Sequence, residues 1–201
     1  MSLQTLHHLY AALAPWSALS LLLLGRGPYL SRVRIVGSLF LALFVLRIPI
    51  AGWTCFQWVM SLEPNPSFTL TALLAVALLQ RVGRVQLFSP EDWKAAWFFG
   101  ALASLILYPM GLGLTSMDPY VLGWRFVLPV AVAVVAIVLI LRGNRFGLIL
   151  LLPFIGFLLG LQESQNFWDA VIDPFYGGGA ILIALGICWQ GIRRRKSLKS
   201  L

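Results

Sequence analysis

The sequence predicts an all-α protein, a polytopic transmembrane helical bundle of about seven spans that forms one integral membrane domain over residues 1–201. Three observations lead to this prediction. Apolar residues make up 60% of the chain and charged residues only 11%, against about 25% charged in a typical soluble domain. The mean hydropathy is +0.88. All but two of the 15 Lys and Arg residues fall in every second loop between apolar stretches, as the cytoplasmic loops of membrane proteins do.

Each apolar stretch is read as one span, and together they leave little of the chain for anything else. A helix needs about 20 residues to cross a hydrocarbon core of ~30 Å. In chain order, the predicted spans are 8–24, 35–59, 67–80, 95–114, 120–141, 146–161 and 174–190. Because basic loops face the cytoplasm, we expect a cytoplasmic C-terminus and an N-terminus outside. The expected location is the plasma membrane, as a multi-pass protein of a bacterial inner membrane.

Several predicted helices begin at a capping residue followed by proline. Ser89-Pro90 precedes two acids and opens the fourth span, while Asp118-Pro119 and Asp173-Pro174 open the fifth and seventh. Such side chains accept hydrogen bonds from the first helical N–H groups, and proline fits the first helical position. Asn65 or Ser67 fits the same role for the third span. Asp118 and Asp173 are therefore first of all expected to be caps.

Two arginines lie within predicted spans. Arg47 is about 18 Å along the second span at 1.5 Å per residue, and a charge at that depth costs about 2.5–3.5 kcal/mol and faces a partner inside the bundle. One reading is an internal ion pair; the other is an anion site for a lipid phosphate. Arg125 either reaches outward to the interface or joins Arg47 in binding the phosphate of a lipid headgroup.

A polar segment follows the sixth span on the outer side. If it is helical, Glu163, Asn166, Asp169 and Asp173 share one face at steps of three, three and four. Such a stripe suits sugar hydroxyls or a divalent cation, or supplies Glu163 and Asp169 as catalytic acid or base. The alternative is a solvated loop that ends in a helix cap. Together with Glu63 and Asp118, these residues are predicted to form a polar outer face.

Several function classes lack the residues they need. His7 and His8 are the two histidines and lie at the N-terminus, so a His-rich zinc site or a bis-His haem site is not expected. No P-loop, GxSxG or HExxH pattern occurs. The basic residues lie beside apolar spans, which indicates membrane topology and not nucleic-acid binding.

Three functions are consistent with these patterns. The first is a binding or accessory subunit of a cell-envelope assembly, with membrane lipids and a larger membrane protein as partners. The second is an enzyme that acts on a lipid-linked phosphate or glycan at the outer leaflet. The third is a small transporter. Many transporters contain inverted repeats, and this sequence shows none. The accessory subunit is the main expectation because so few catalytic groups are present.

Overall fold

The structure, a computed structural model, describes residues 32–62, 66–114, 116–162 and 164–198, and its regular structure is almost entirely helical. The predicted all-α class is therefore confirmed. The predicted span 8–24 lies outside the described residues, as do His7, His8, Glu63 and Glu163.

The elements follow the chain in a simple order. They are α2 (Arg32–Leu46), β1 (Pro49–Ile50), β2 (Trp53–Thr54), α3 (Cys55–Leu62), α4 (Phe68–Gly83), α5 (Pro90–Gly111), the 3-10 helix η1 (Pro119–Trp124), α6 (Val127–Leu141), α7 (Phe146–Ile149), α8 (Leu152–Leu158), α9 (Phe167–Val171) and α10 (Pro174–Leu198). The two strands form a short antiparallel hairpin.

The region predicted as one span over 35–59 is broken in the structure. Helix α2 ends at Leu46 and a hairpin follows, with Ala51 and Gly52 at positive φ in its two-residue turn. Pro49 explains the break, because it has no N–H to donate and disfavours a helical residue before it. Arg47 therefore lies in an exposed turn. Its predicted position in the middle of a continuous helix is wrong.

The remaining spans differ from the prediction mainly at their ends. Helix α5 begins at Pro90, capped by Ser89, so it starts before residue 95. The predicted span 120–141 divides into η1 and α6, and the predicted span 146–161 divides into α7 and α8. Each of these pieces is shorter than the span predicted for its region.

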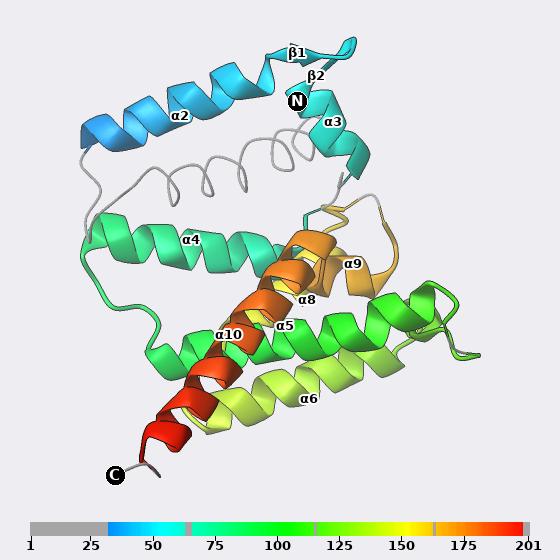
Figure 1. Cartoon of the computed structure of the whole chain (residues 1–201). Coiled ribbons are helices and arrows are strands. Elements are labelled where there is room, and N and C mark those ends of the chain that lie inside the picture. The colour runs from blue at the N-terminus through cyan, green and yellow to red at the C-terminus, as the bar shows by residue number, and fades with distance from the viewer. Residues whose placement is uncertain (1–31, 63–65, 115, 163, 199–201) are drawn as a thin grey trace.

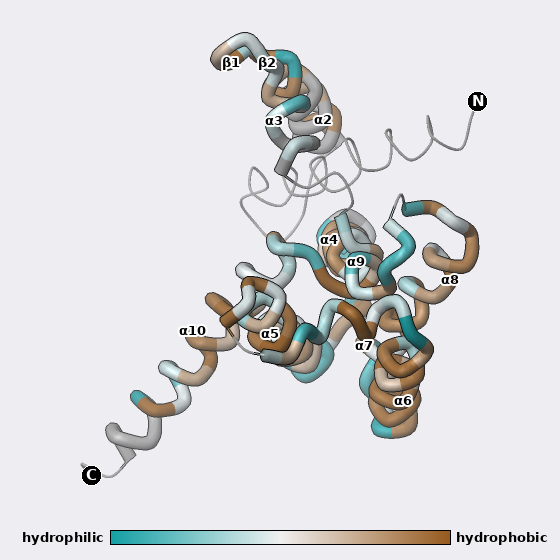
Figure 2. Tube along the Cα trace, turned by 90° about the vertical axis from the view of Figure 1, so that its right-hand side faces the viewer, coloured by the Kyte–Doolittle hydropathy of each residue, from teal (hydrophilic) through white to brown (hydrophobic). Residues whose placement is uncertain are grey.

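Two parts of the chain lie apart in both views of the backbone. Helices α5 and α6 run in a similar direction, with α7 between them in Figure 2, while α4 lies above α5 and α10 crosses α5 obliquely (Figure 1). Helices α2 and α3 and the hairpin lie on the far side of α4 (Figures 1 and 2). Helix α10 packs most extensively against α5. The site described below lies at the end of α5 that is farther from the C-terminus.

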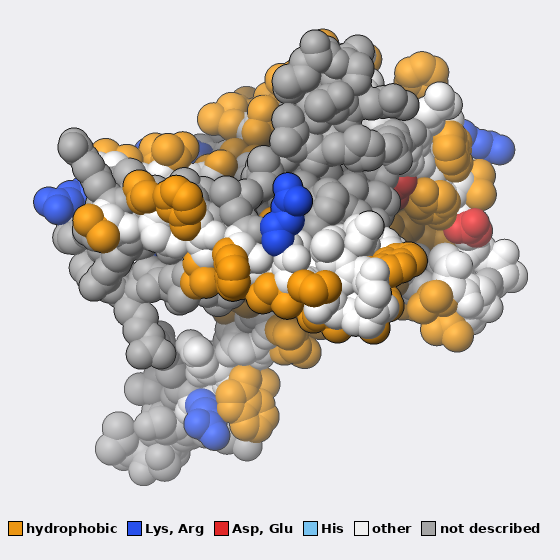
Figure 3. Space-filling view, turned by 90° about the horizontal axis from the view of Figure 1, so that it is seen from above, with side chains coloured by type: hydrophobic (Ala, Val, Ile, Leu, Met, Phe, Trp, Pro, Cys, Tyr) orange, Lys and Arg blue, Asp and Glu red, His pale blue; other side chains and the backbone are white. Residues whose placement is uncertain are grey.

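Hydrophobic side chains cover much of the described surface (Figure 3). By length and composition, Pro174–Arg193 of α10 is the one helix among the described residues that is able to cross a membrane. The segments Phe68–Arg81, Val127–Leu141 and Phe146–Leu158 are apolar but shorter. The structure thus supports one span by length, and the seven-span arrangement stays a prediction.

Small residues bring α5 and α10 close together. A Cβ on Gly100 would lie 2.7 Å from Tyr176 Cζ and 2.8 Å from the Cβ of Ala180. A Cβ on Gly177 would lie 2.1 Å from Ser104 Oγ. Small residues at helix contacts of this kind are typical of helices that pack within membranes.

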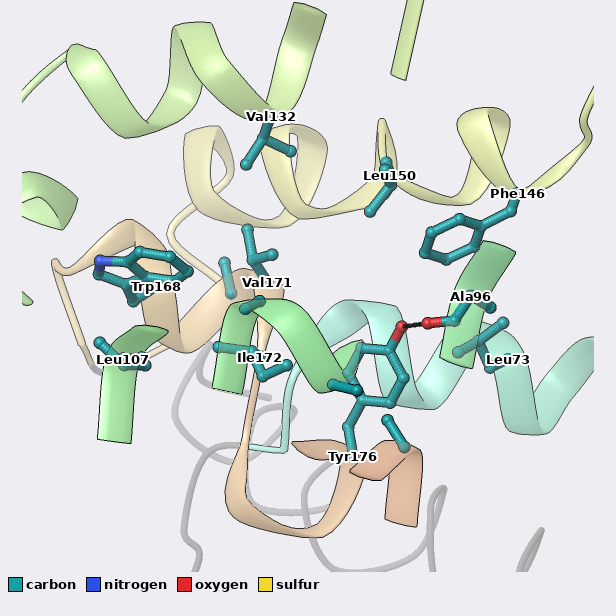
Figure 4. Packing of buried hydrophobic residues seen from close by; sticks show 14 of the residues in the cluster. Leu73, Ala96, Leu107, Val132, Phe146, Leu150, Trp168, Val171, Ile172 and Tyr176 are labelled. Atoms are coloured by element: carbon teal, nitrogen blue, oxygen red, sulfur yellow. Dashed lines mark hydrogen bonds between the residues drawn. The ribbon is translucent and has the colours of Figure 1, made fainter. Parts of the chain in front are cut away.

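The core is built around the short helix α9 and the contact between α5 and α10. Phe167 and Val171 of α9 are at most 1% exposed, and the Phe167 ring lies 4.8 Å from that of Phe154. The buried Tyr176 hydroxyl donates a 2.6 Å hydrogen bond to the Ala96 carbonyl (Figure 4). This hydroxyl is satisfied, and it joins α10 to α5 inside an otherwise apolar core.

Candidate functional site

A pocket of about 360 Å³ lies where the end of α5, η1 and the start of α10 meet. We call it the acidic pocket. Its polar lining consists of Asp118, Tyr120, Asp169, Asp173 and Tyr108. The apolar lining is Leu107, Gly111, Leu112, Ile172 and Pro174. Its volume falls in the range of small-molecule binding sites.

The wall formed by η1 is held in place by side chains at the start of α9. Asn166 Nδ2 donates to the Tyr120 carbonyl at 2.9 Å, and Trp168 Nε1 donates to the Pro119 carbonyl at 2.8 Å. A Cβ on Gly123 would lie 1.6 Å from Asn166 Oδ1, so this contact requires glycine. The two segments, more than 40 residues apart in sequence, therefore position one side of the acidic pocket together.

Asp118 begins η1 as the sequence predicts. Its Oδ1 accepts a 2.9 Å hydrogen bond from Tyr120 N, and Pro119 occupies the first helical turn. The predicted cap is thus confirmed. The side chain is exposed at the rim of the acidic pocket.

Asp169 is the carboxylate with the most side-chain partners in the acidic pocket. Its Oδ2 accepts hydrogen bonds from the Tyr120 hydroxyl at 2.9 Å and from the Ser164 hydroxyl. Tyr120 lies in η1, outside the apolar helix α6, and burial followed by the hydrogen bond to Asp169 raises its pKa to about 12. The phenol therefore stays protonated at neutral pH and serves Asp169 as a donor.

Asp173 joins the beginnings of two helices. Its Oδ2 accepts hydrogen bonds from Ser67 N at 2.9 Å and from Ser67 Oγ at 2.6 Å, while Oδ1 accepts one from Tyr176 N at 2.8 Å. The predicted cap of α10 is therefore confirmed, and the same carboxylate also anchors α4. Burial raises the pKa of Asp173 above its usual range, although these hydrogen bonds act in the opposite direction.

The predicted polar stripe is only partly present. Helix α9 contains only Phe167–Val171, so Asn166 and Asp173 are not on one helical face with Asp169. Asn166 is 0% exposed and caps α9, and Asp173 is 2% exposed. Neither side chain is exposed, because each turns inward to satisfy backbone groups at a helix start. Asp118, Asp169 and Asp173 nevertheless line the same pocket.

The two predicted anion-binding arginines lie elsewhere. Arg125 follows η1 and is exposed, as is Arg47 in its turn. Among the described residues that line the acidic pocket, none is Lys or Arg. The described chain also contains no group of three or more His, Cys, Asp or Glu side chains placed to hold a metal ion. The pocket chemistry is therefore that of carboxylates and phenols.

Sequence reasoning missed the tyrosines and Ser164 of the site, and it named Ser67 only as a possible helix cap, which it is for α4. Tyr108, Tyr120 and Ser164 line the acidic pocket or contact Asp169, and Ser67 contacts Asp173 from a helix 106 residues away. The one local signal was the position of Tyr120, two residues after the predicted cap Asp118. The other contacts have no signature in the sequence.

Comparison with known proteins finds no relative of this chain. No protein family model, curated protein or solved structure matches the chain.

Proposed function

We propose that this chain is a multi-pass protein of a bacterial inner membrane that acts as a binding or accessory subunit of a cell-envelope assembly. In this proposal, its acidic pocket holds the headgroup of a lipid or a glycan on the outer side. Membrane lipids and a larger membrane protein are its expected partners.

The first support is the exposed apolar surface of α6. Val127, Val130, Val134, Ile137 and Leu141 are all more than half exposed and follow one another at steps of three and four. Residues at this spacing form one continuous face along a helix. Hydrophobic faces of this extent are stable when lipid or another protein covers them.

The second support is the separation of charge between the two ends of the bundle. The C-terminal ends of α4, α6 and α10 lie at the same end as the start of α5 (Figure 1). This end carries the described residues Arg81, Arg84, Lys94, Arg142, Arg145 and Arg193. The acidic pocket lies toward the opposite end. This arrangement agrees with a cytoplasmic basic end and an outer acidic end.

The observation that carries the binding function is the acidic pocket itself. Its carboxylates accept hydrogen bonds, and the rings of Tyr108 and Tyr120 offer flat apolar surface. Sugar hydroxyls and the ammonium group of a lipid headgroup both provide donors for such oxygens, and an ammonium group also interacts with aromatic faces. Bare phosphate is disfavoured there because carboxylates repel it.

One observation favours an enzyme as the second candidate. Asp169 lies in the acidic pocket with a phenol and a hydroxyl as hydrogen-bond partners, and a positioned carboxylate of this kind serves as a general acid or base. The predicted arginine pair for phosphate is absent from the pocket lining, so this candidate would act on a glycan. Glu163, the other predicted catalytic residue, lies outside the described residues.

The test compares Asp169→Asn with Glu91→Gln, which removes an acid at the opposite end of the bundle. Both proteins are purified in mild detergent, and co-purified lipids with sugar or amine headgroups are measured by mass spectrometry. We expect Asp169→Asn to retain severalfold less of these lipids while Glu91→Gln retains the wild-type amount. Equal retention by both variants would contradict the proposal. Turnover of a lipid-linked glycan by the wild type, lost in Asp169→Asn, would favour the enzyme instead.

A further inference from the structure

A second hollow lies at the basic end of the bundle. It has a volume of about 290 Å³ and is lined by Gln86, Ser89, Asp92, Gly143 and Arg145. It lies between the start of α5 and the turn that joins α6 to α7. We call it the arginine hollow.

Asp92 fixes the turn against α5. Its Oδ2 accepts a hydrogen bond from Ser89 N at 2.7 Å, and its Oδ1 accepts one from Arg145 N at 2.7 Å. The residue is only 3% exposed. Both carboxylate oxygens are thus occupied by backbone N–H groups, and Asp92 acts as the internal anchor of the hollow.

The guanidinium of Arg145 is held over the hollow by one of its nitrogens. Nη1 donates to the Gln86 carbonyl at 3.2 Å and to the Leu87 carbonyl at 2.5 Å. In the described part of the chain, its remaining N–H groups have no hydrogen-bond partner. Because a guanidinium is planar and binds phosphate oxygens through two N–H groups at once, a fixed and partly unused Arg is well suited to a phosphate.

We infer that the arginine hollow binds the phosphate of an anionic phospholipid, and this inference rests on the proposed membrane location. Leu141 and Leu148 lie on either side of the turn in sequence and are 81% and 55% exposed. They supply apolar surface for acyl chains next to the charged group. Arg142, also exposed, adds a second positive charge on the same turn. The cytoplasmic leaflet, which the basic end faces in this proposal, is the one that attracts basic residues through its anionic lipids.

The experiment measures lipid binding to the detergent-purified protein by native mass spectrometry. Phosphatidylglycerol is compared with phosphatidylcholine of the same acyl chains, and only intact folded protein is counted. Wild type is expected to prefer phosphatidylglycerol. Arg145→Gln should weaken that binding roughly tenfold, as expected for one lost charge-assisted contact. Arg145→Lys keeps the charge but loses the planar guanidinium. Its binding of phosphatidylglycerol should lie between that of wild type and that of Arg145→Gln.

The matched control is Arg125→Gln, which removes an exposed arginine at the other end of the bundle. It should change phosphatidylglycerol binding by less than about twofold, because exposed charges interact weakly over that distance. Equal binding of the two lipids by wild type would overturn the inference. An equal loss in Arg125→Gln, or full competition by inorganic phosphate at the same concentration as the lipid, would overturn it as well.

The experiment distinguishes a failure of this inference from a failure of the proposed function. A protein that needs detergent but shows no lipid preference would contradict only the arginine hollow. A protein that stays monodisperse in buffer without detergent would contradict the membrane location itself. Asp169→Asn should leave phosphatidylglycerol binding unchanged, because the acidic pocket lies at the opposite end.

Discussion

Two neighbouring glycines of α10 provide a direct test of the packing between α5 and α10. A Cβ on Gly177 would lie 2.1 Å from Ser104 Oγ and 3.0 Å from both Ser104 Cβ and Tyr108 Cε2. A Cβ on Gly178 would meet no atom within 4 Å. Both residues lie in the same helix turn, so Gly178→Ala is a matched control for Gly177→Ala.

The expected difference follows from these distances. Replacing glycine by alanine inside a helix stabilises it by roughly 0.5–1 kcal/mol, and both variants share this gain. Only Gly177→Ala also overpacks the helix contact, which costs about 1–3 kcal/mol. We therefore expect Gly177→Ala to be less stable than Gly178→Ala by about 1–3 kcal/mol, or roughly 2–12 °C in melting temperature for a chain of this length.

The assay is thermal unfolding of both variants in the same detergent, followed by circular dichroism. Ser104→Ala in the Gly177→Ala background removes the closest atom, and it should recover part of the loss as a coupling of about 0.5–3 kcal/mol. Equal melting temperatures for Gly177→Ala and Gly178→Ala would refute the close approach of the two helices. If Ser104→Ala recovers no stability, the contact with Ser104 Oγ is not the cause of the loss in Gly177→Ala.

Three further predictions concern buried or partly buried polar groups. Asp92→Ala removes two backbone hydrogen bonds and should lower the free energy of unfolding by about 2–3 kcal/mol, measured by chemical denaturation with the exposed Glu91→Ala as the near-neutral comparison. Burial raises the pKa of Asp173, so the folded state holds this proton more tightly than the unfolded chain. Stability should fall as pH rises above the ordinary Asp value of about 3.9, and Asp173→Asn should flatten that slope; an unchanged slope would contradict the assignment. Tyr120→Phe should remove an absorbance titration step near pH 12 and lower stability by about 1–2 kcal/mol through the lost hydrogen bond to Asp169; a titration curve identical to wild type would contradict this reading.

Helix starts were the most predictable part of the fold. Ser89 and Asp118 cap the helices that the sequence predicted for them, and the Asp173 carboxylate accepts a hydrogen bond from Tyr176 N at the start of α10. A cap acts on N–H groups within three or four residues of itself. Its effect is therefore visible in a short stretch of sequence.

The break at Arg47 shows the limit of hydropathy as a guide. Residues 35–59 are apolar enough to read as one span, yet Pro49 and Gly52 allow a hairpin in the middle. Hydropathy measures the transfer of side chains and carries no information about the backbone. Pro49 and Gly52 are the sequence signals for this break.

The sequence by itself determined the helical class, the alternation of basic and acidic loops along the chain, and the helix caps. The tertiary structure alone decided that Asp169 faces Tyr120 across 49 residues, that Asn166 turns inward, and that Ser67 meets Asp173. The reason is physical: propensity and capping act between residues close in the chain, whereas a pocket is defined by which distant segments pack together. That packing depends on the shapes of whole helix faces, such as the contact of Gly177 with Ser104, which no local pattern encodes.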